Sequence, residues 1–206
     1  IIPVDSEHFS ILKLVENQNF DNVKKIYLTA SGGPFLNFSY KQLKKVKPKH
    51  AITHPRWNMG KKISVDSSTL MNKMLELIEA QKLFNIHSNK LDILIHPNSL
   101  IHAIVQFKNG LTKILYHETS MIIPISNAIF GDNLDIEKIY KIDKKKIIDN
   151  LIFKKVNTKI FPVYKLKNII NEYPSTSIII NAANEILVDQ FLQKKLAFLS
   201  ISKTIM

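Results

Sequence analysis

Two acidic side chains follow the first apolar residues of the chain. Ile1–Val4 predicts a short buried strand, and Asp5 and Glu7 come next, two residues apart. Residues i and i+2 of an extended chain project to the same side, so both carboxylates can point at one place. Like charges at short range repel unless a cation or proton lies between them, and an all-oxygen site favours Mg²⁺ or Mn²⁺. The alternative is a solvated turn in which Asp5 caps the next helix, and the pair alone favours that alternative.

A helix predicted from Ser68 to Phe84 brings a third carboxylate. On this helix Asn72 and Glu76 share one face, and Lys73 forms an i,i+3 pair with Glu76 at the edge of that face. The first turns of a helix favour anions, because backbone N–H groups and the positive end of the helix dipole lie there. With Ser67, Asn72 and Lys73, this helix start suits a phosphate group, and Glu76 could reach a metal. An ordinary amphipathic helix with a surface ion pair is the alternative.

Two loops and two histidines are further candidates. Ser31-Gly32-Gly33 offers unhindered backbone N–H groups and a hydroxyl, as in an anion nest, although many such turns are only turns. The segment His54-Pro55-Arg56-Trp57-Asn58-Met59-Gly60 holds the chain's only tryptophan in a polar loop. Either a lid that excludes water from a bound substrate or a tryptophan packed back on the core accounts for it. His96 and His102 lie near strand ends, where hydrogen-bonded structural histidines are more common than catalysts, and His102 is kept as a candidate for supporting a site residue.

The elements that must position these side chains alternate between strand and helix, which predicts an α/β fold, an α+β domain with a mixed sheet and helices. Asp66-Ser67 is a good N-cap pair for the long helix, and Asn109-Gly110 between two apolar runs predicts a hairpin. The predicted strands are Ile1–Val4, Lys25–Thr29, Lys62–Val65, Leu91–Ile95, Ile101–Phe107 and Leu111–Tyr116, and the predicted helices are Phe9–Val15, Lys41–Val46 and Ser68–Phe84.

Three parts of the chain are expected. Residues 1–128 form the metal- and substrate-binding domain, and residues 129–159 form a linker or peripheral arm that contains the run Lys144-Lys145-Lys146. Residues 160–206 read as the start of an all-α domain, with Asn181-Ala182-Ala183-Asn184-Glu185 at a helix start.

Composition restricts the class of protein. The chain has 206 residues, 45% of them hydrophobic, and no cysteine, which excludes disulfides and thiolate metal sites. No apolar stretch reaches the roughly 20 residues needed to span a bilayer, and no signal-peptide pattern is present, so a soluble intracellular protein is expected. The net charge of +12 comes from lysines and the single arginine Arg56, which favours a solvated basic surface over a nucleic-acid binder, because base-edge readers depend on arginine.

Four segments in order resemble the 1-deoxy-D-xylulose 5-phosphate reductoisomerase family. They are Pro3-Val4-Asp5-Ser6-Glu7-His8, Thr29-Ala30-Ser31-Gly32-Gly33-Pro34-Phe35, the His54–Gly60 segment, and Ile63-Ser64-Val65-Asp66-Ser67-Ser68-Thr69-Leu70-Met71-Asn72-Lys73. Ile95-His96-Pro97 with His102, and the Asn181–Glu185 segment, extend the likeness over nearly the whole chain. The resemblance implies an NADPH- and divalent-metal-dependent enzyme of non-mevalonate isoprenoid biosynthesis, which converts 1-deoxy-D-xylulose 5-phosphate to 2-C-methyl-D-erythritol 4-phosphate. A non-catalytic sugar-phosphate or metal-binding module is the alternative.

The resemblance also implies roles for individual residues. The implied metal ligands are Asp5, Glu7 and Glu76; the implied substrate contacts are Ser6, Ser31, His54, Trp57, Ser67, Asn72 and Lys73. Glu7, Lys73 and His54 are the implied catalytic residues. Trp57 and Met59 belong to the segment that is a mobile flap in the family, and Met59 and Gly60 are the implied cofactor contacts.

Several departures from the family pattern are visible. Met74 stands where a small residue is usual and is expected to face neighbouring packing, while Glu118-Thr119-Ser120-Met121 lacks the usual Pro-Asp pair. The five glycines form no Gly-x-Gly-x-x-Gly, so a dinucleotide-binding Rossmann domain is expected to be missing. The chain therefore reads as a fragment, inactive by itself, of a bacterial cytoplasmic homodimer, with a plastid source as the alternative.

Overall fold

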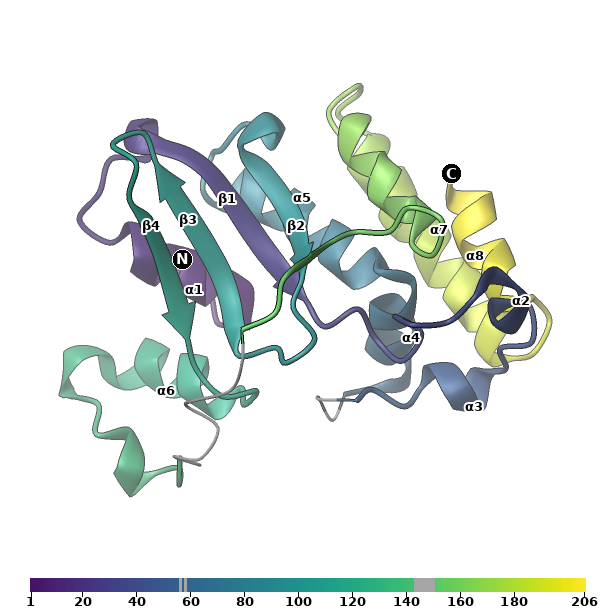
Figure 1. Ribbon diagram of the computed structural model, residues 1–206, viewed down its shortest axis with the longest axis horizontal. Helices are drawn as coiled ribbons and strands as arrows, with labels where there is room; N and C mark the ends of the chain where they lie inside the picture. The colour runs from purple at the N-terminus through teal and green to yellow at the C-terminus, as the bar shows by residue number, and fades with distance from the viewer. Residues whose placement is uncertain (56, 58, 143–150) are drawn as a thin grey trace. The chain divides into compact units, whose positions relative to one another are not determined.

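A five-stranded mixed sheet forms around β1 (Val23–Ala30), with the strand order β4-β3-β1-β2-β5 (Figure 1). β1 pairs in parallel with β2 (Leu91–Ile95) and antiparallel with β3 (Ile101–Phe107). β3 also pairs antiparallel with β4 (Thr112–Tyr116), and β5 (Lys154–Lys155) lies at the edge beside β2. Because β1 has a strand on each side, its inward residues are buried completely, as expected of a central strand. The predicted mixed sheet is confirmed.

This structure is a computed structural model, and it describes residues 1–55, 57, 59–142 and 151–206. The chain forms two compact units, each built from two separate stretches. The first unit consists of Ile1–Ser31 and Asn89–Lys154, and the second of Gly32–Ser88 and Lys155–Met206. Among the described helices, none combines the length and apolar character needed to cross a membrane.

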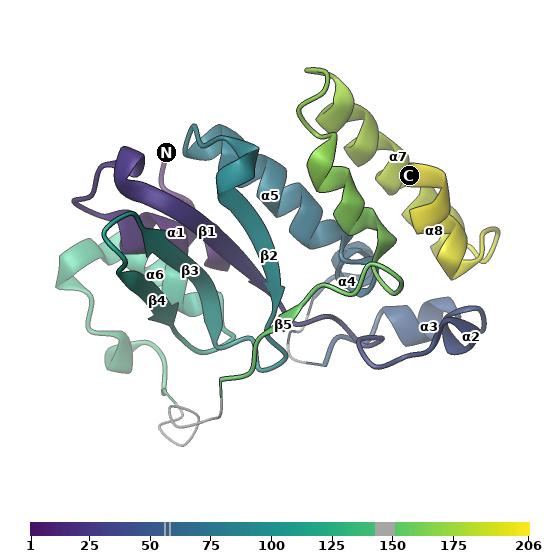
Figure 2. The same cartoon turned by 45° about the horizontal axis from the view of Figure 1, so that its top comes forward.

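The first unit packs one helix against the sheet. α1 (Ser6–Val15) contacts β3, β4 and β1 (Figure 2). It buries Phe9, Ile11 and Leu14. The predicted hairpin joins β3 to β4, where the Phe107 N–H donates to the Leu111 carbonyl across 2.8 Å. The remaining elements of this unit are short: η1 (Phe20–Asn22), α6 (Ile122–Phe130), η3 (Gly131–Asn133) and η4 (Ile136–Lys138), with η2 (Ser88–Lys90) leading into β2. The predicted lysine run at 144–146 lies outside the described residues.

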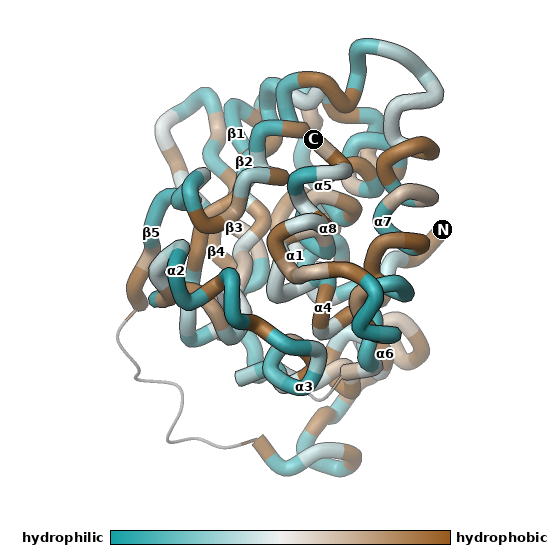
Figure 3. The backbone as a smooth tube through the Cα atoms, turned by 90° about the vertical axis from the view of Figure 1, so that its right-hand side faces the viewer, coloured by the Kyte–Doolittle hydropathy of each residue, from teal (hydrophilic) through white to brown (hydrophobic). Residues whose placement is uncertain are grey.

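The second unit is helical. Its elements are α2 (Tyr40–Leu43), α3 (Pro48–Ala51), α4 (Lys61–Thr69), α5 (Met71–Leu83), η6 (Pro162–Asn168), α7 (Thr176–Leu192) and α8 (Phe198–Ile205). Hydrophobic stretches lie along both α7 and α8 (Figure 3). α8 buries its apolar residues Phe198 and Ile201, whereas α7 leaves several isoleucines exposed. The core contains Phe35, whose ring centroid lies 5.0 Å from that of Phe198, and Val65 from α4 packs in the same cluster.

The predictions for residues 1–15 and 62–67 were wrong in part. Ile1–Val4 forms no strand, because Ile1, Ile2 and Val4 are exposed and α1 already begins at Ser6. Lys62–Val65 belongs to α4, so Asp66 and Ser67 lie inside a helix instead of capping one. The β-branched side chains Ile63 and Val65 favour a strand locally, but packing of α4 against α7 outweighs that preference.

Two helix boundaries also differ from the prediction. The long helix is broken at Leu70, which has a φ of 70°, so α4 ends before it and α5 begins after it. Asn181–Glu185 lies within α7, which begins at Thr176, and does not start that helix. By contrast, β2 and β3 have the predicted bounds, and Met74 is fully buried as expected.

Candidate functional site

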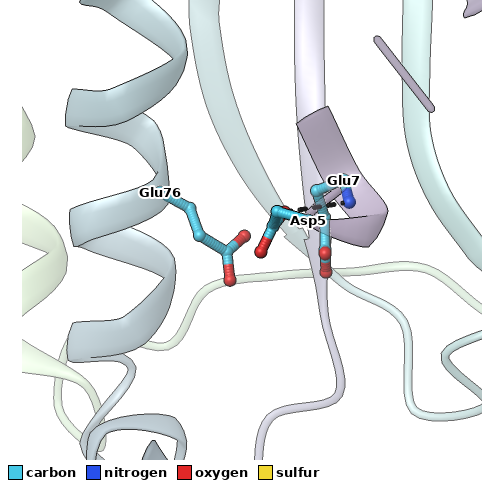
Figure 4. A group of neighbouring side chains, drawn as sticks. All are labelled: Asp5, Glu7 and Glu76. Atoms are coloured by element: carbon cyan, nitrogen blue, oxygen red, sulfur yellow. Dashed lines mark hydrogen bonds between the residues drawn. The ribbon is translucent and has the colours of Figure 1, made fainter. Parts of the chain in front are cut away.

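The acidic pair of the first unit is set by the start of α1. Asp5 is the N-cap residue, and its Oδ1 accepts the backbone N–H groups of Glu7 at 3.1 Å and His8 at 3.3 Å. Figure 4 shows Asp5 and Glu7 with the first of these bonds. The Ser6 hydroxyl donates to Glu7 Oε2, and both carboxylates are half-buried. The two acids are therefore neighbours because a helix begins between them, and not because they alternate along a strand.

The third carboxylate belongs to the second unit. Glu76 projects from α5 (Figure 4) and is only 6% exposed. One turn earlier on the same helix, Asn72 donates from Nδ2 to Oε1 and Lys73 donates from Nζ to Oε2 across 2.6 Å. Lys73 is itself 6% exposed, so this is a buried ion pair and not the surface pair that the alternative interpretation required. Asn72, Lys73 and Glu76 form one polar cluster at the start of α5, as the sequence predicted.

The Ser-Gly-Gly turn approaches the end of α4 closely. A Cβ atom added to Gly33 would lie 3.0 Å from the Ser67 carbonyl oxygen and 3.0 Å from Ser68 Cα. Gly33 has a φ of 62° and Gly32 a φ of 83°, both in the left-handed region that favours glycine. A side chain at position 33 would press on the backbone of Ser67 and Ser68, so glycine is favoured at this close approach. Ser31, the last residue of the first unit, is half-buried.

The charge of Lys73 in the α5 cluster acts on the side chain of His54. Burial, together with the smaller effect of the positive charge of Lys73, lowers the pKa of His54 to about 4. Its Nδ1 accepts the Trp57 backbone N–H at 2.8 Å, so the neutral ring carries its hydrogen on Nε2 and can donate from there. Trp57 and Met59 are half-buried, and Gly60 is the exposed N-cap of α4. Arg56 and Asn58 of this segment lie outside the described residues.

The candidate histidines of the first unit have structural hydrogen bonds. His102 is buried, lies 3.1 Å from the His117 carbonyl through Nε2, and stacks on the His117 ring at a centroid distance of 3.7 Å. His96 Nδ1 lies 2.9 Å from the Ile152 carbonyl oxygen, and its ring stacks on Phe153. These contacts agree with the structural interpretation of both residues.

The sequence did not indicate a buried polar group next to His102, which consists of His117 and Glu118. Burial lowers the pKa of His117, while its bond to the Glu118 carbonyl and the charge of Glu7 act in the opposite direction. The neighbouring Glu118 is buried and accepts a hydrogen bond from the Tyr140 hydroxyl at 2.9 Å. In the sequence this group shows only as a His-Glu pair after a strand, a pattern too common to indicate a functional site.

A second missed group joins α4 to α7. Asp66 is 1% exposed and accepts from Asn184 Nδ2 at 2.9 Å and from Lys62 Nζ at 3.0 Å. Burial raises the pKa of Asp66, and the two hydrogen bonds partly oppose that rise. Asp66 was expected to cap a helix, and no local pattern relates it to a residue so far along the chain.

Comparison with known proteins identifies the family. The model described as "1-deoxy-D-xylulose 5-phosphate reductoisomerase C-terminal domain" matches residues 1–84, and "DXP reductoisomerase C-terminal domain" matches residues 117–206. The curated 1-deoxy-D-xylulose 5-phosphate reductoisomerase of Pelagibacter ubique is 50% identical over 205 residues, which cover 99% of this chain and 53% of that protein. The one from Wolbachia pipientis wMel is 47% identical over 208 residues, covering 100% and 53%. The chain thus spans about half the length of the curated relatives it matches.

Solved structures agree with this assignment. A DOX-P reductoisomerase in complex with NADPH, fosmidomycin and magnesium superposes with a TM-score of 0.90 at 34% identity, covering 100% of this chain and 53% of that one. The 1-deoxy-D-xylulose 5-phosphate reductoisomerase of Zymomonas mobilis in complex with NADPH gives 0.88 at 37% identity, covering 98% and 52%. The fold and the matches define the C-terminal region of a reductoisomerase. The chain belongs to the 1-deoxy-D-xylulose 5-phosphate reductoisomerase family, as the sequence motifs indicated.

Proposed function

We propose that this chain is the metal- and substrate-binding part of an NADP-dependent enzyme that converts 1-deoxy-D-xylulose 5-phosphate to 2-C-methyl-D-erythritol 4-phosphate. The observation that carries the proposal is the cluster at the start of α5, in which half-buried Asn72 and buried Lys73 both donate to buried Glu76. Burying an ion pair costs desolvation free energy, so stability alone does not account for this pair. It lies at a helix start, where an anion is favoured. The curated names of the relatives support the same reaction.

We further propose that Asp5, Glu7 and Glu76 hold the divalent metal. Each offers a carboxylate oxygen, and three carboxylates without sulfur or imidazole suit a hard cation such as Mg²⁺ or Mn²⁺ (Figure 4). A solved relative carries magnesium, which supports the same choice of ion. When bound, the metal would act as a Lewis acid that stabilises negative charge on the substrate oxygens. The N-cap bonds of Asp5 and the helical position of Glu7 would orient these two acids before the ion arrives.

The remaining site residues would bind and orient the substrate. The proposed contacts are Ser6, Ser31, His54, Trp57, Ser67, Asn72 and Lys73. Among them, Lys73 supplies a fixed positive charge, and neutral His54 supplies an N–H donor from Nε2. Glu7, Lys73 and His54 are the proposed catalytic residues. Phosphate binding away from the reacting carbons supplies binding energy and orientation for the chemical step.

The segment around Trp57 would close over the substrate. Trp57 presents a large amphipathic surface that excludes water from the reacting carbonyl. Met59 and Gly60 would contact NADPH, a cofactor that accompanies two solved relatives. The proposed enzyme is a homodimer that acts in the bacterial cytoplasm, and its substrate is a small sugar phosphate.

The test is NADPH oxidation by the complete gene product with 1-deoxy-D-xylulose 5-phosphate and Mg²⁺ or Mn²⁺. We expect Glu76→Gln to lower kcat/KM by more than about 100-fold and to weaken Mn²⁺ binding measured by electron paramagnetic resonance. Glu79→Gln is the matched control, since Glu79 is on the same helix but exposed. Wild-type protein that binds Mn²⁺ but never oxidises NADPH would instead be a non-catalytic metal- and sugar-phosphate-binding module.

A further inference from the structure

A buried hydrogen bond joins two helices of the second unit that are distant in sequence. Asn184 on α7 donates from Nδ2 to Asp66 Oδ1 on α4 across 2.9 Å, although the two residues are 118 positions apart. The side-chain orientation follows from chemistry, because an ionised carboxylate accepts hydrogen bonds and only the amide nitrogen donates them. Asn184 is 0% exposed and Asp66 is 1% exposed, so water competes with neither. The bond therefore holds α4 to α7 at one defined point.

The polar pair is an unfavourable way to fill a helix interface. An aspartate inside a helix is a poor helix former, and a buried carboxylate loses its hydration. The Asn184 Oδ1 atom is also buried, and no described residue donates a hydrogen bond to it. Apolar residues of similar size would avoid both penalties while filling the same space. What the polar pair supplies, and apolar packing does not, is a fixed distance and direction between the two helices.

Asp66 is the first member of a hydrogen-bonded turn that connects α4 to α5. The Thr69 hydroxyl donates to the Asp66 carbonyl at 3.1 Å, and the Met71 N–H donates back to that hydroxyl at 3.3 Å. Between them, Leu70 has a φ of 70°, a conformation that costs a non-glycine residue about 1–2 kcal/mol. Such a residue stays in place only when its surroundings hold it there. An anchored Asp66 is part of those surroundings.

We propose that Asn184 is a positioning residue, which anchors Asp66 so that the turn from α4 to α5 presents Ser67, Asn72 and Lys73 in the geometry needed to bind the substrate phosphate. This inference rests on the proposed function of those three residues. Ser67 directly follows Asp66, and the other two lie in the first turn of α5, directly after Leu70. Asn184 acts on the substrate only through this turn.

Hydrogen–deuterium exchange tests the anchoring without any need for catalysis. We expect Asn184→Ala to raise amide exchange in residues 67–74 by about tenfold, the effect of losing one hydrogen bond to a charged group. Asn181→Ala, the same substitution at an exposed position of α7, is the control and leaves exchange in this segment unchanged. Equal exchange in the two variants overturns the proposal.

Steady-state kinetics separates positioning from simple loss of stability. For Asn184→Ala we expect KM for 1-deoxy-D-xylulose 5-phosphate to rise about tenfold, while KM for NADPH stays within about twofold. The double variant Asp66→Asn with Asn184→Asp reverses donor and acceptor, and we expect it to recover most of the loss in KM. Faster exchange in residues 67–74 with an unchanged substrate KM would make Asn184 a purely structural residue and refute the proposal. If the wild-type protein shows no turnover, the proposed function fails. The dissociation constant for inorganic phosphate then replaces KM in this comparison and still decides whether Asn184 anchors Asp66.

Discussion

Gly33→Ala should be far more damaging than the same substitution one residue earlier. Both glycines have a positive φ, so alanine at either position costs about 1–2 kcal/mol of backbone strain. They differ in what the new methyl group meets. At Gly33 it would lie 3.0 Å from the Ser67 carbonyl oxygen and from Ser68 Cα, which are backbone atoms of a helix. At Gly32 it would meet the end of the Leu36 side chain, 2.7 Å from Cδ1, which can rotate away.

The steric contact at Gly33 adds to the backbone strain that both positions share. Forcing a methyl group against a packed backbone typically costs a further 1–3 kcal/mol or so. Gly33→Ala should therefore lower the free energy of unfolding by about 2–5 kcal/mol, and Gly32→Ala by about 1–2 kcal/mol. Gly60→Ala is a third reference, because Gly60 has a negative φ and nothing within 4 Å of its Cβ position. Its expected cost is below about 1 kcal/mol, that of an altered N-cap.

Urea denaturation followed by tryptophan fluorescence measures these differences in the second unit, because Trp57 is the only tryptophan and lies in that unit. Gly33→Ala should also weaken binding of inorganic phosphate, since the displaced backbone is that of Ser67. If Gly33→Ala and Gly32→Ala destabilise the protein equally, the close approach of the glycine turn to α4 is refuted. Unchanged stability in both variants would also contradict the positive φ values.

Three further perturbations test the second unit. The pKa of His54 is about 4 when folded and 6.5 in a flexible chain, so the unfolded state binds an extra proton between these values. The free energy of unfolding should therefore fall as pH falls from 6.5 towards 4, and His54 should contribute nothing to its pH dependence above 6.5. Urea titrations at several pH values should show a smaller loss for His54→Gln than for the wild type. Lys73→Met should destabilise the metal-free protein by about 3–5 kcal/mol, because it leaves the Glu76 charge buried without its ammonium partner, and a thermal melt in which it matches wild type would contradict the buried ion pair. Phe191→Ala should cost about 3–5 kcal/mol in urea unfolding, since Phe191 is 1% exposed and packs on Phe198, whereas Phe130→Ala, at a half-exposed residue, should cost much less.

The α5 cluster could be predicted from the sequence, because one local period decides it. Asn72 and Glu76 differ by four positions, and any helix through them places both on one face. Burial of the Lys73–Glu76 pair could not be predicted in the same way, because an identical spacing occurs on solvated helices. Burial depends on what other parts of the chain cover.

The start of the chain shows the opposite case. An extended strand is predicted up to Asp5 and Glu7, whereas the structure has a capped helix that begins at Ser6. Both geometries bring the two acids close together, so the proposed metal ligands do not depend on the strand that was predicted wrongly. Asp5 caps α1 and still lies beside Glu7, so the N-cap and the acidic pair occur together.

Local patterns in the sequence alone determined the hairpin at Asn109-Gly110, strands β2 and β3, the polar face of α5 and, through ordered motifs, the family. Each depends on neighbours within a few positions, where backbone geometry limits the outcomes. Only the tertiary structure decided that residues 61–69 form a helix and that Asp66 bonds to Asn184. Those outcomes depend on which distant surfaces exclude water from one another, and no short stretch of sequence contains that information.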